Sequence, residues 1–329
     1  MPPIPCDGYE RADWLQHISD EISIAELCLP ATHETLALYG FPISVCQTQA
    51  LEQQLLEGIR FIDVRFAYVK KKRRHVHLDE KNTQPRELLA YHGIQSQRLK
   101  AVDVLNLLVD FVEKHPSEFV IVSIKQENRA AGFEQAVMNL IATNSKRWFL
   151  ERRIPTLREA RGKLVLFSRF GQDPGGIQLP TWPDNQPQAW RTFFDGRDVI
   201  VQDRYLIGVL DIPEKAAVSA ALIEDALLPL DQSRSRASST SSCKPMIPLQ
   251  ASDNAWRIDF TSGGSPPFAY PVVVAKGLSI PCLSLFAGVN ERIKSTLIAA
   301  TDKGQKARGL VLLMDFYDLE MVDLIITLN

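Results

Sequence analysis

Charged and titratable side chains recur in this 329-residue chain where apolar, strand-like segments end. They are His33, Glu34, Asp63, Arg65, His92, Lys125, Arg169, Asp203, Tyr205 and Asp315. Histidines suit general acid and base work near neutral pH, and a guanidinium matches phosphate oxygens with a planar fork that stays charged. Two histidines and one arginine around a phosphodiester would allow cleavage without a metal. A hard cation requires several oxygen ligands, and Arg65 would take the position that such a cation would otherwise occupy.

Asp63 and Arg65 are the most informative pair, because residues two apart on a strand point to the same face. A charged pair that faces a protein interior is costly unless its members are paired and used. A purely structural ion pair is the alternative. In the same way, a strand-end aspartate can cap the next helix, and a lone histidine is more often a satisfied hydrogen-bonding residue than a catalyst. The coincidence of many such residues at strand ends favours a functional site.

Apolar segments of strand length alternate along the chain with amphipathic segments of helix length. The expected strands are 23–29, 59–66, 88–92, 119–125, 163–168, 199–203, 257–261 and 309–316. The expected helices are 46–57, 99–114, 133–143, 212–227, 290–302 and 318–327. Nearly continuous Val, Ile and Leu in several strands indicates burial on both faces, as in a parallel sheet covered by helices. The pattern predicts an α/β barrel, in which the carboxyl ends of the strands converge on one mouth.

Composition is that of an ordinary globular protein. Hydrophobic residues make up 45%, charged residues 23%, and the formal net charge of −2 gives no global basic field for nucleic acid. The cysteines are scattered without metal-ligand spacing, so we expect free thiols rather than disulfides or a zinc site; they are Cys6, Cys28, Cys46, Cys243 and Cys282. The N-terminus lacks an apolar signal core, and no window reaches the roughly 18 apolar residues of a membrane span. We expect a protein that is cytoplasmic or peripherally associated with a membrane, with secretion not indicated.

Three segments interrupt the alternation, and none has the character of a separate domain. Residues 70–82 form an inserted, highly charged loop, and residues 231–253 form a Ser-rich inserted loop. Residues 177–194 mix Pro with aromatic side chains, and we expect an irregular excursion that packs its aromatics on the barrel; a membrane-touching loop is the alternative. Residues 1–22 precede the first strand as an extension.

Seven motifs, in their order along the chain, resemble the X domain of phosphatidylinositol-specific phospholipase C of the bacterial, calcium-independent type. They are LCLPATHET, EGIRFIDVRF, LLAYHG, KHPSEFVIVSIKQE, GKLVLFSR, VQDRY and GLVLLMDF. The resemblance runs from about Ile24 to Asn329. It implies one catalytic domain over residues 1–329 with the fold of a distorted TIM barrel. It also implies cleavage of phosphatidylinositol, at a membrane surface, to diacylglycerol and a cyclic inositol phosphate, with no cofactor.

The resemblance also implies roles for the individual residues. His33 would remove the proton of the inositol 2-hydroxyl, and His92 would protonate the diacylglycerol oxygen. Arg65 would hold the phosphate in place of a calcium ion. Supporting roles would fall to Asp63, which positions that centre, and to Asp315, which orients His33. The contacts to the inositol ring would come from Lys125, Arg169, Asp203 and Tyr205.

The chain departs from the family pattern at two places. Glu34 stands where the bacterial enzymes more often have Asp, which adds a methylene at a site expected to tune the proton of His92. The charged insertion brings His75 and His77 as rivals for the role of acid; we prefer His92 because its strand and the following Gly93 fit the motif. The five consecutive Lys or Arg at 70–74 are either a solvated face or a site of attraction for anionic lipid headgroups.

Two other functions remain open at this level. One is a phosphodiesterase that acts on another glycerophosphodiester or on a soluble inositol compound. The other is a module that has lost catalysis and binds inositol phosphates or anionic lipid. The presence of His33, Arg65 and His92 together argues against the second.

Overall fold

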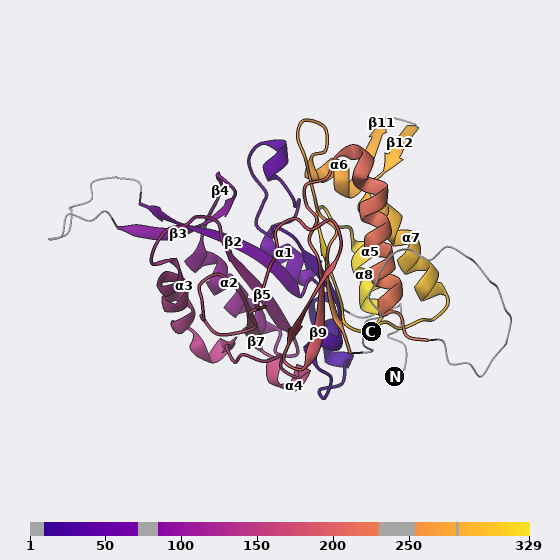
Figure 1. The fold of residues 1–329 in the computed structure, drawn as a ribbon. Coiled ribbons are helices and arrows are strands. Elements are labelled where there is room, and N and C mark those ends of the chain that lie inside the picture. Colours follow the sequence, from indigo (N-terminus) through magenta and orange to yellow (C-terminus); the bar gives the residue numbers. More distant parts are fainter. Residues whose placement is uncertain (1–9, 72–84, 230–253, 281–282) are drawn as a thin grey trace.

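The computed structural model describes residues 10–71, 85–229, 254–280 and 283–329 (Figure 1). All of the inserted segment 231–253 and most of the segment 70–82 lie outside these ranges, as do His75, His77, Cys6, Cys243 and Cys282. The structure therefore does not test the expectations for those loops and residues.

One curved sheet of 11 strands forms the centre of the described chain (Figure 1). Strands of this sheet run parallel in the spatial order β6 Trp148–Phe149, β7 Lys163–Arg169, β5 Phe119–Gln126, β2 Phe61–Lys70, β1 Cys28–Thr32, β13 Leu310–Met314, β10 Trp256–Phe260 and β9 Arg197–Gln202. At one edge β8, Trp190–Phe194, runs antiparallel to β9. The fold is a distorted TIM barrel, as expected, and among the described residues no ladder joins β6 to β8.

Helices cover the outside of this sheet and follow the sequence periodicity. They are α1 Leu51–Leu56, α2 Ala101–Lys114, α3 Phe133–Ala142, α4 Leu157–Ala160, α5 Ile212–Ala226, α6 Pro271–Lys276, α7 Val289–Asp302 and α8 Leu319–Thr327. In α2 the buried side chains recur at helical spacing, as at Val104, Leu105, Leu108 and Val112, so one stripe faces the sheet. Helices α4 and α6 were not expected, and no helix within the described ranges is long and apolar enough to cross a membrane.

Two strand expectations were wrong in detail. The first strand runs through Pro30 and ends at Thr32, whereas residues Ile24–Glu26 form a 3₁₀ turn. The expected third barrel strand is instead β3, Arg86–His92, which runs antiparallel to β2 and continues into the hairpin strand β4, Gln95–Lys100. Strand β2 extends beyond the barrel to Lys70, and β3 runs back alongside it toward the barrel. His92, the last residue of β3, therefore lies at the mouth.

An aromatic cluster fills the barrel on its open side. The ring centroid of Phe167 lies 5.6 Å from Phe61 and 6.0 Å from Trp256. Trp182 packs edge-on against both Phe167 and Phe260, at 6.2 and 6.0 Å. The expectation that the 177–194 segment packs its aromatics on the barrel holds for Trp182, while residues 190–194 form β8 rather than an irregular excursion. Trp182 therefore bridges β7 and β10, which the backbone ladder leaves unconnected.

A buried ion pair lies at the start of β2, at the opposite end of the strands from the mouth. Arg60 Nε donates to Glu118 Oε2 at 2.8 Å, and both side chains are fully buried. Arg60 also donates to the carbonyl of Ala12 at 2.6 Å, and Trp14 donates to the carbonyl of Gly58. The described part of the N-terminal extension is thus bonded to the barrel floor.

Candidate active site

Strand register places three cations in one row across the mouth. Arg65 on β2 is the Cα partner of Lys125 on β5, and Lys125 is the partner of Arg169 on β7. Two residues earlier on the same strands, the matching row is Asp63, Ser123 and Phe167. Because side chains alternate along a strand, both rows face the barrel interior. The Arg65 charge, together with burial, lowers the pKa of Lys125.

Arg65 is held by carboxylates from three segments of the chain. Its Nε and Nη2 donate to Asp63 Oδ2 at 3.1 and 2.9 Å, and its Nη1 lies 2.6 Å from Glu34 Oε1. Glu127 Oε1 lies 3.5 Å from the same Nη1. Burial by itself would raise the pKa of Asp63, but the guanidiniums of Arg65 and Arg169 outweigh it and hold that pKa well below its usual range. Breaking such a buried pair costs about 3–5 kcal/mol, so Arg65 has a fixed position.

The turn after β1 directs His33 and Glu34 to different neighbours. The backbone N–H of His33 donates to the carbonyl of Met314 on β13, and that of Thr35 donates to the carbonyl of Asp63 on β2. Glu34 lies between them with a φ of 43°, in the left-handed region that non-glycine residues rarely adopt. This strained turn sends His33 toward β13 and Glu34 toward Arg65. Burial, which Arg65 only partly offsets, raises the pKa of Glu34.

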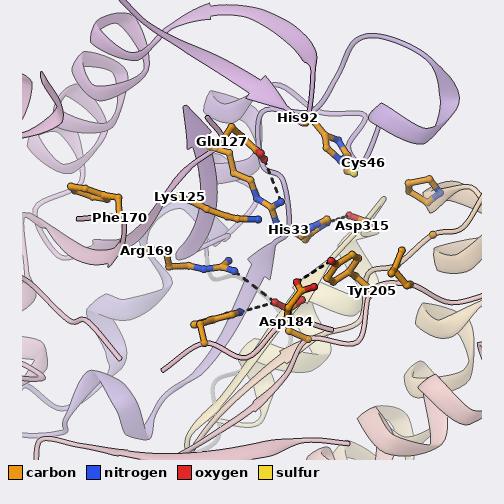
Figure 2. Close-up of a pocket in the computed structure, with 18 of the residues that line it drawn as sticks. His33, Cys46, His92, Lys125, Glu127, Arg169, Phe170, Asp184, Tyr205 and Asp315 are labelled. Atoms are coloured by element: carbon orange, nitrogen blue, oxygen red, sulfur yellow. Dashed lines mark hydrogen bonds and ion pairs between the residues drawn. The ribbon is translucent and has the colours of Figure 1, made fainter. Parts of the chain in front are cut away.

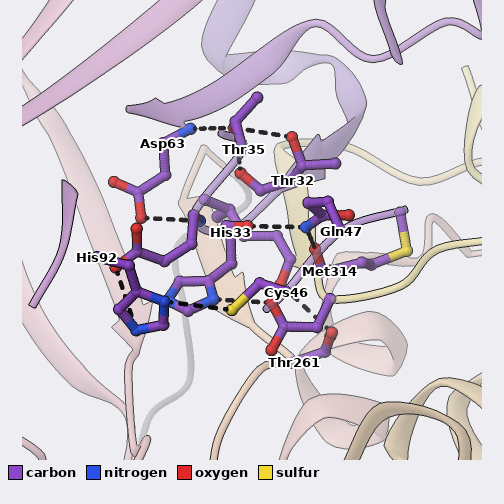
Figure 3. Close-up of polar contacts among 12 residues, drawn as sticks. Thr32, His33, Thr35, Cys46, Gln47, Asp63, His92, Thr261 and Met314 are labelled. Atoms are coloured by element: carbon purple, nitrogen blue, oxygen red, sulfur yellow. Dashed lines mark hydrogen bonds and ion pairs between the residues drawn. The ribbon is translucent and has the colours of Figure 1, made fainter. Parts of the chain in front are cut away.

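His33 and Asp315 form a hydrogen-bonded pair at the carboxyl ends of β1 and β13. Nδ1 of His33 donates to Oδ1 of Asp315 at 2.8 Å, and the Asp315 side chain is 1% exposed. Gln47 fixes the backbone on both sides, because its Nε2 donates to the carbonyls of His33 and Met314 (Figure 3). Asn290 on α7 donates to the carbonyl of Asp315 at 2.8 Å. With Nδ1 committed to the carboxylate, Nε2 of His33 is left to act as an acceptor.

His92 reaches the same mouth from the β3–β4 hairpin. Its Nδ1 donates to the carbonyl of Ser44 at 3.2 Å and lies 3.9 Å from the thiol sulfur of Cys46 (Figure 3). Its Nε2 lies 3.7 Å from Oε1 of Glu34. The Glu34 carboxylate therefore lies closer to Arg65 than to His92.

Arg169 lies flat over an aromatic ring on the far side of the pocket. Its guanidinium carbon is 3.9 Å from the Trp182 ring centroid, and its Nη2 is 3.7 Å from Oδ2 of Asp203. The Trp182 indole N–H donates to the same Asp203 oxygen at 2.9 Å. The phenol of Tyr205 donates to Oδ1 of Asp184 at 3.0 Å. These contacts fix a polar and aromatic wall opposite the histidines.

A pocket of about 770 Å³ opens between these groups (Figure 2). Eight of the ten residues expected from sequence line it: His33, Arg65, His92, Lys125, Arg169, Asp203, Tyr205 and Asp315. Asp63 and Glu34 do not line it, because they are buried behind Arg65. The pocket thus combines two imidazoles, three cations and a hydrogen-bonding wall, which suits a phosphodiester with a hydroxyl-rich headgroup.

Among the pocket residues that the sequence analysis did not assign to the site, four carry polar, thiol or indole groups close to the expected ones: Cys46, Glu127, Trp182 and Asp184. Glu127 follows Lys125 by two positions, so strand alternation alone could have placed it on the same face. Trp182 and Asp184 lie in the aromatic segment, whose path no sequence pattern predicts. Cys46 was expected to begin a helix over 46–57 and to be an ordinary free thiol, but α1 begins only at Leu51 and Cys46 precedes it in an irregular stretch.

The fold and the site together define an α/β barrel that carries a polar pocket at the carboxyl ends of its parallel strands. Comparison with known proteins identifies the kind of barrel. Residues 29–170 match the family model described as phosphatidylinositol-specific phospholipase C, X domain. The match agrees with the resemblance found in the motifs and covers less than half of the chain.

Curated relatives match part of the chain. A 1-phosphatidylinositol phosphodiesterase of Listeria monocytogenes is 30% identical over 169 residues, which cover 47% of this chain and 48% of the relative. A protein of the same name from Staphylococcus aureus is 22% identical over 216 residues, covering 59% of this chain and 64% of the relative. The chain thus matches about half to two thirds of the length of these relatives.

Solved structures of the bacterial enzymes share the fold over nearly the whole chain. The phosphatidylinositol-specific phospholipase C from Listeria monocytogenes superposes with a TM-score of 0.64 at 21% identity, covering 98% of this chain and 99% of that one. The F249X mutant of the Staphylococcus aureus enzyme gives a TM-score of 0.68 at 20% identity, covering 97% and 98%. At this level of identity the likeness establishes the architecture of the barrel.

Proposed function

We propose that this protein cleaves phosphatidylinositol, or a closely related inositol phosphodiester, at a membrane surface. The observation that carries the proposal is that His33, His92 and Arg65 come from three separate elements to line one pocket. Lys125, Arg169, Asp203 and Tyr205 line the rest of it and offer hydrogen-bonding partners for a polyhydroxylated ring. The names of the curated relatives, each a 1-phosphatidylinositol phosphodiesterase, support the same substrate class.

Attack by a neighbouring hydroxyl makes the reaction intramolecular, so the protein must mainly orient groups, transfer protons and stabilise charge. Nε2 of His33 accepts the proton of the inositol 2-hydroxyl, whose oxygen bonds to phosphorus, while Asp315 stabilises the imidazolium that forms. The bond from phosphorus to the diacylglycerol oxygen breaks, and His92 donates a proton to that oxygen. Arg65 stabilises the charge on the phosphate oxygens. The products are diacylglycerol and a cyclic inositol phosphate.

The chemistry of the donors around Arg65 fits this metal-independent route. The carboxylates of Asp63 and Glu34 are turned toward the guanidinium and are buried behind it. A calcium ion would need six or more oxygen ligands, and the guanidinium lies where those carboxylates would have to converge. We therefore expect Arg65 to do the work of a cation at the phosphate.

The rim of the pocket has the apolar character of a surface that docks on lipid. Four large apolar side chains there are each at least 56% exposed, and each lines the pocket or lies within two positions of a residue that does: Phe41, Ile94, Leu206 and Phe268. Exposed apolar groups gathered around a mouth mark a membrane or partner surface. With a lipid as the expected substrate, a bilayer is the occupant that we infer, and the protein would be peripherally associated with it.

The proposal is tested by turnover of phosphatidylinositol vesicles with and without EDTA, using wild type and a His33→Ala variant. Activity should survive the chelator, and His33→Ala should lower kcat by about 10²- to 10⁴-fold, the usual worth of a positioned acid or base. His115→Ala is the matched control, because His115 is also paired to a carboxylate, Asp13 at 2.9 Å, but does not line the pocket. Activity restored only by calcium, or an unimpaired His33→Ala protein, would contradict the proposal.

A further inference from the structure

A thiol lies beside the histidine–aspartate pair, where the proposed reaction gives it no task. One ligand atom from each of His33, Cys46 and Asp315 lies within 4.8 Å of the others. All three residues line the pocket, and Figure 2 shows Cys46 between His92 and the His33–Asp315 pair. An imidazole, a thiol and a carboxylate are the three side-chain types that bind zinc in proteins.

Asp315 gives an independent sign that a cation fits here. Its Oδ2 is buried and accepts no hydrogen bond of ordinary geometry from any described residue, while its Oδ1 is bonded to His33. The carboxylate has lost its water here, and the nearby Cys46 thiol compensates only weakly because a thiol is a weak hydrogen-bond donor. A cation bound in the pocket would satisfy that oxygen.

The spacing of the donors suits zinc better than calcium or magnesium. Zinc bonds of about 2.3 Å to sulfur and 2.0–2.1 Å to nitrogen place the two ligand atoms about 3.6 Å apart. The three ligand atoms here lie within 4.8 Å of one another, so side-chain movements of about 1 Å would bring them to zinc-binding distance. A thiolate selects a soft or borderline cation, whereas calcium and magnesium prefer oxygen ligands. We expect water at the fourth position, because Nδ1 of His92, although 3.9 Å from the Cys46 sulfur, donates to the carbonyl of Ser44.

We propose that His33, Cys46 and Asp315 form a Zn²⁺ site within the catalytic pocket, and that zinc inhibits the enzyme by occupying it. Zinc takes a ring nitrogen of His33 and a carboxylate oxygen of Asp315, so the pair is no longer free to accept the proton of the attacking hydroxyl. Binding releases the Cys46 thiol proton to solvent. The inhibition rests on the proposed phosphodiesterase function, whereas the binding site does not.

Zinc binding is measured by competition with a chromogenic zinc chelator, using reduced, metal-free wild type, Cys46→Ser and Cys28→Ala proteins. Cys28 is buried on β1 and does not line the pocket, so Cys28→Ala is the matched loss of one thiol. Wild type and Cys28→Ala should bind zinc alike, and Cys46→Ser should bind it at least about 100-fold more weakly because a hydroxyl is a poor zinc ligand. Equal affinity in wild type and Cys46→Ser would overturn the site.

Activity on phosphatidylinositol vesicles is then titrated with zinc, each protein being compared with its own metal-free rate. Wild type should be inhibited at the zinc concentration that fills the site and restored by EDTA, and Cys46→Ser should need at least about 100-fold more zinc. Zinc that binds through Cys46 without inhibiting, or that activates, would overturn the inhibitory role. If the protein has no activity on vesicles, the chelator competition still decides the site. Should Cys46→Ser fail to fold, a thiolate-to-metal charge-transfer band in Co²⁺-loaded wild type tests the ligand directly, and its absence counts against the proposal.

Discussion

Arg65 and Lys125 are Cα partners on the neighbouring parallel strands β2 and β5, and both side chains line the pocket. Their situations differ. Arg65 is held by Asp63, Glu34 and Glu127, whereas the side chain of Lys125 makes no hydrogen bond or ion pair with any described residue. The ammonium group of Lys125 is therefore the more readily available of the two for a ligand hydroxyl.

Replacing Lys125 by Met should weaken headgroup binding more than it slows the chemical step. A hydrogen bond to a charged group is worth about 1.5–3 kcal/mol, so KM should rise about 10- to 100-fold while kcat changes little. The measurement is steady-state kinetics on a water-soluble inositol phosphodiester. Lys146→Met, at an exposed lysine outside the pocket, is the control. A fall in kcat with unchanged KM would instead mean that Lys125 stabilises the transition state rather than the bound substrate.

Asp315→Asn should lower kcat and leave KM nearly unchanged. The amide keeps the shape of the carboxylate but can hold the His33 ring in the wrong tautomer and cannot stabilise its imidazolium. The expected loss in kcat is about 10²- to 10⁴-fold, measured together with the melting temperature to show that the barrel is intact. Wild-type kcat in this variant would show that the 2.8 Å contact between His33 and Asp315 is only structural.

A double change of Ile94→Ser and Phe268→Ser should reduce vesicle binding. These side chains are 101% and 76% exposed at the pocket rim, so the change removes apolar surface that we expect to enter the bilayer. Sedimentation with phosphatidylinositol-containing vesicles measures the loss, and turnover of a water-soluble substrate should persist. Phe193→Ser is the control, since Phe193 is also exposed but pairs with Asp198 near the start of β9, away from the mouth. Equal losses in both proteins would argue against a docking rim.

Trp182→Phe should destabilise the fold more than Trp190→Phe does. Trp182 donates its indole N–H to Asp203 at 2.9 Å and stacks under the Arg169 guanidinium, whereas the Trp190 indole nitrogen has no hydrogen-bond partner among the described residues. Loss of the bond, with Asp203 left partly unsatisfied, is worth about 1–2 kcal/mol. Denaturant unfolding of both variants checks the difference, and the expectation fails if Trp190→Phe is the more damaging.

Asp259 should impose a pH dependence on stability that Asp259→Asn removes. Burial raises the pKa of Asp259 to about 6, although Lys215 and hydrogen bonds from Ser219 and Gln202 oppose the shift. Between the ordinary carboxyl pKa and about 6, the folded protein holds a proton that the unfolded chain has released. This contribution to stability is therefore present at low pH and is lost as pH rises through that window.

The lost contribution is on the order of 3 kcal/mol, from two pKa units at 1.36 kcal/mol each. Unfolding free energies measured from pH 4 to pH 7 should therefore fall with pH in wild type relative to Asp259→Asn. Asp302→Asn, at an exposed aspartate, should leave the wild-type pH dependence unchanged. Parallel curves for wild type and Asp259→Asn would mean that Asp259 does not titrate in this range.

The sequence predicted most of the barrel because its strands are buried on both faces and its helices bury one stripe, and both patterns are local. It also anticipated that Asp63 and Arg65 share a face, because strand parity requires it. The antiparallel course of β3 could not be read in this way. A short apolar run has the same composition in a parallel strand and in a hairpin, and only pairing with β2 distinguishes the two.

The amino-acid sequence by itself determined which side chains stand at the carboxyl ends of the strands, because alternation and strand length are properties of neighbouring residues. Tertiary structure alone decided which of them meet. Register set Arg65 beside Lys125 and Arg169, and the strained turn at Glu34 sent His33 to Asp315. Packing of an irregular stretch brought Cys46 between the two histidines. Such juxtapositions depend on contacts between residues far apart in the chain, and no local pattern encodes them.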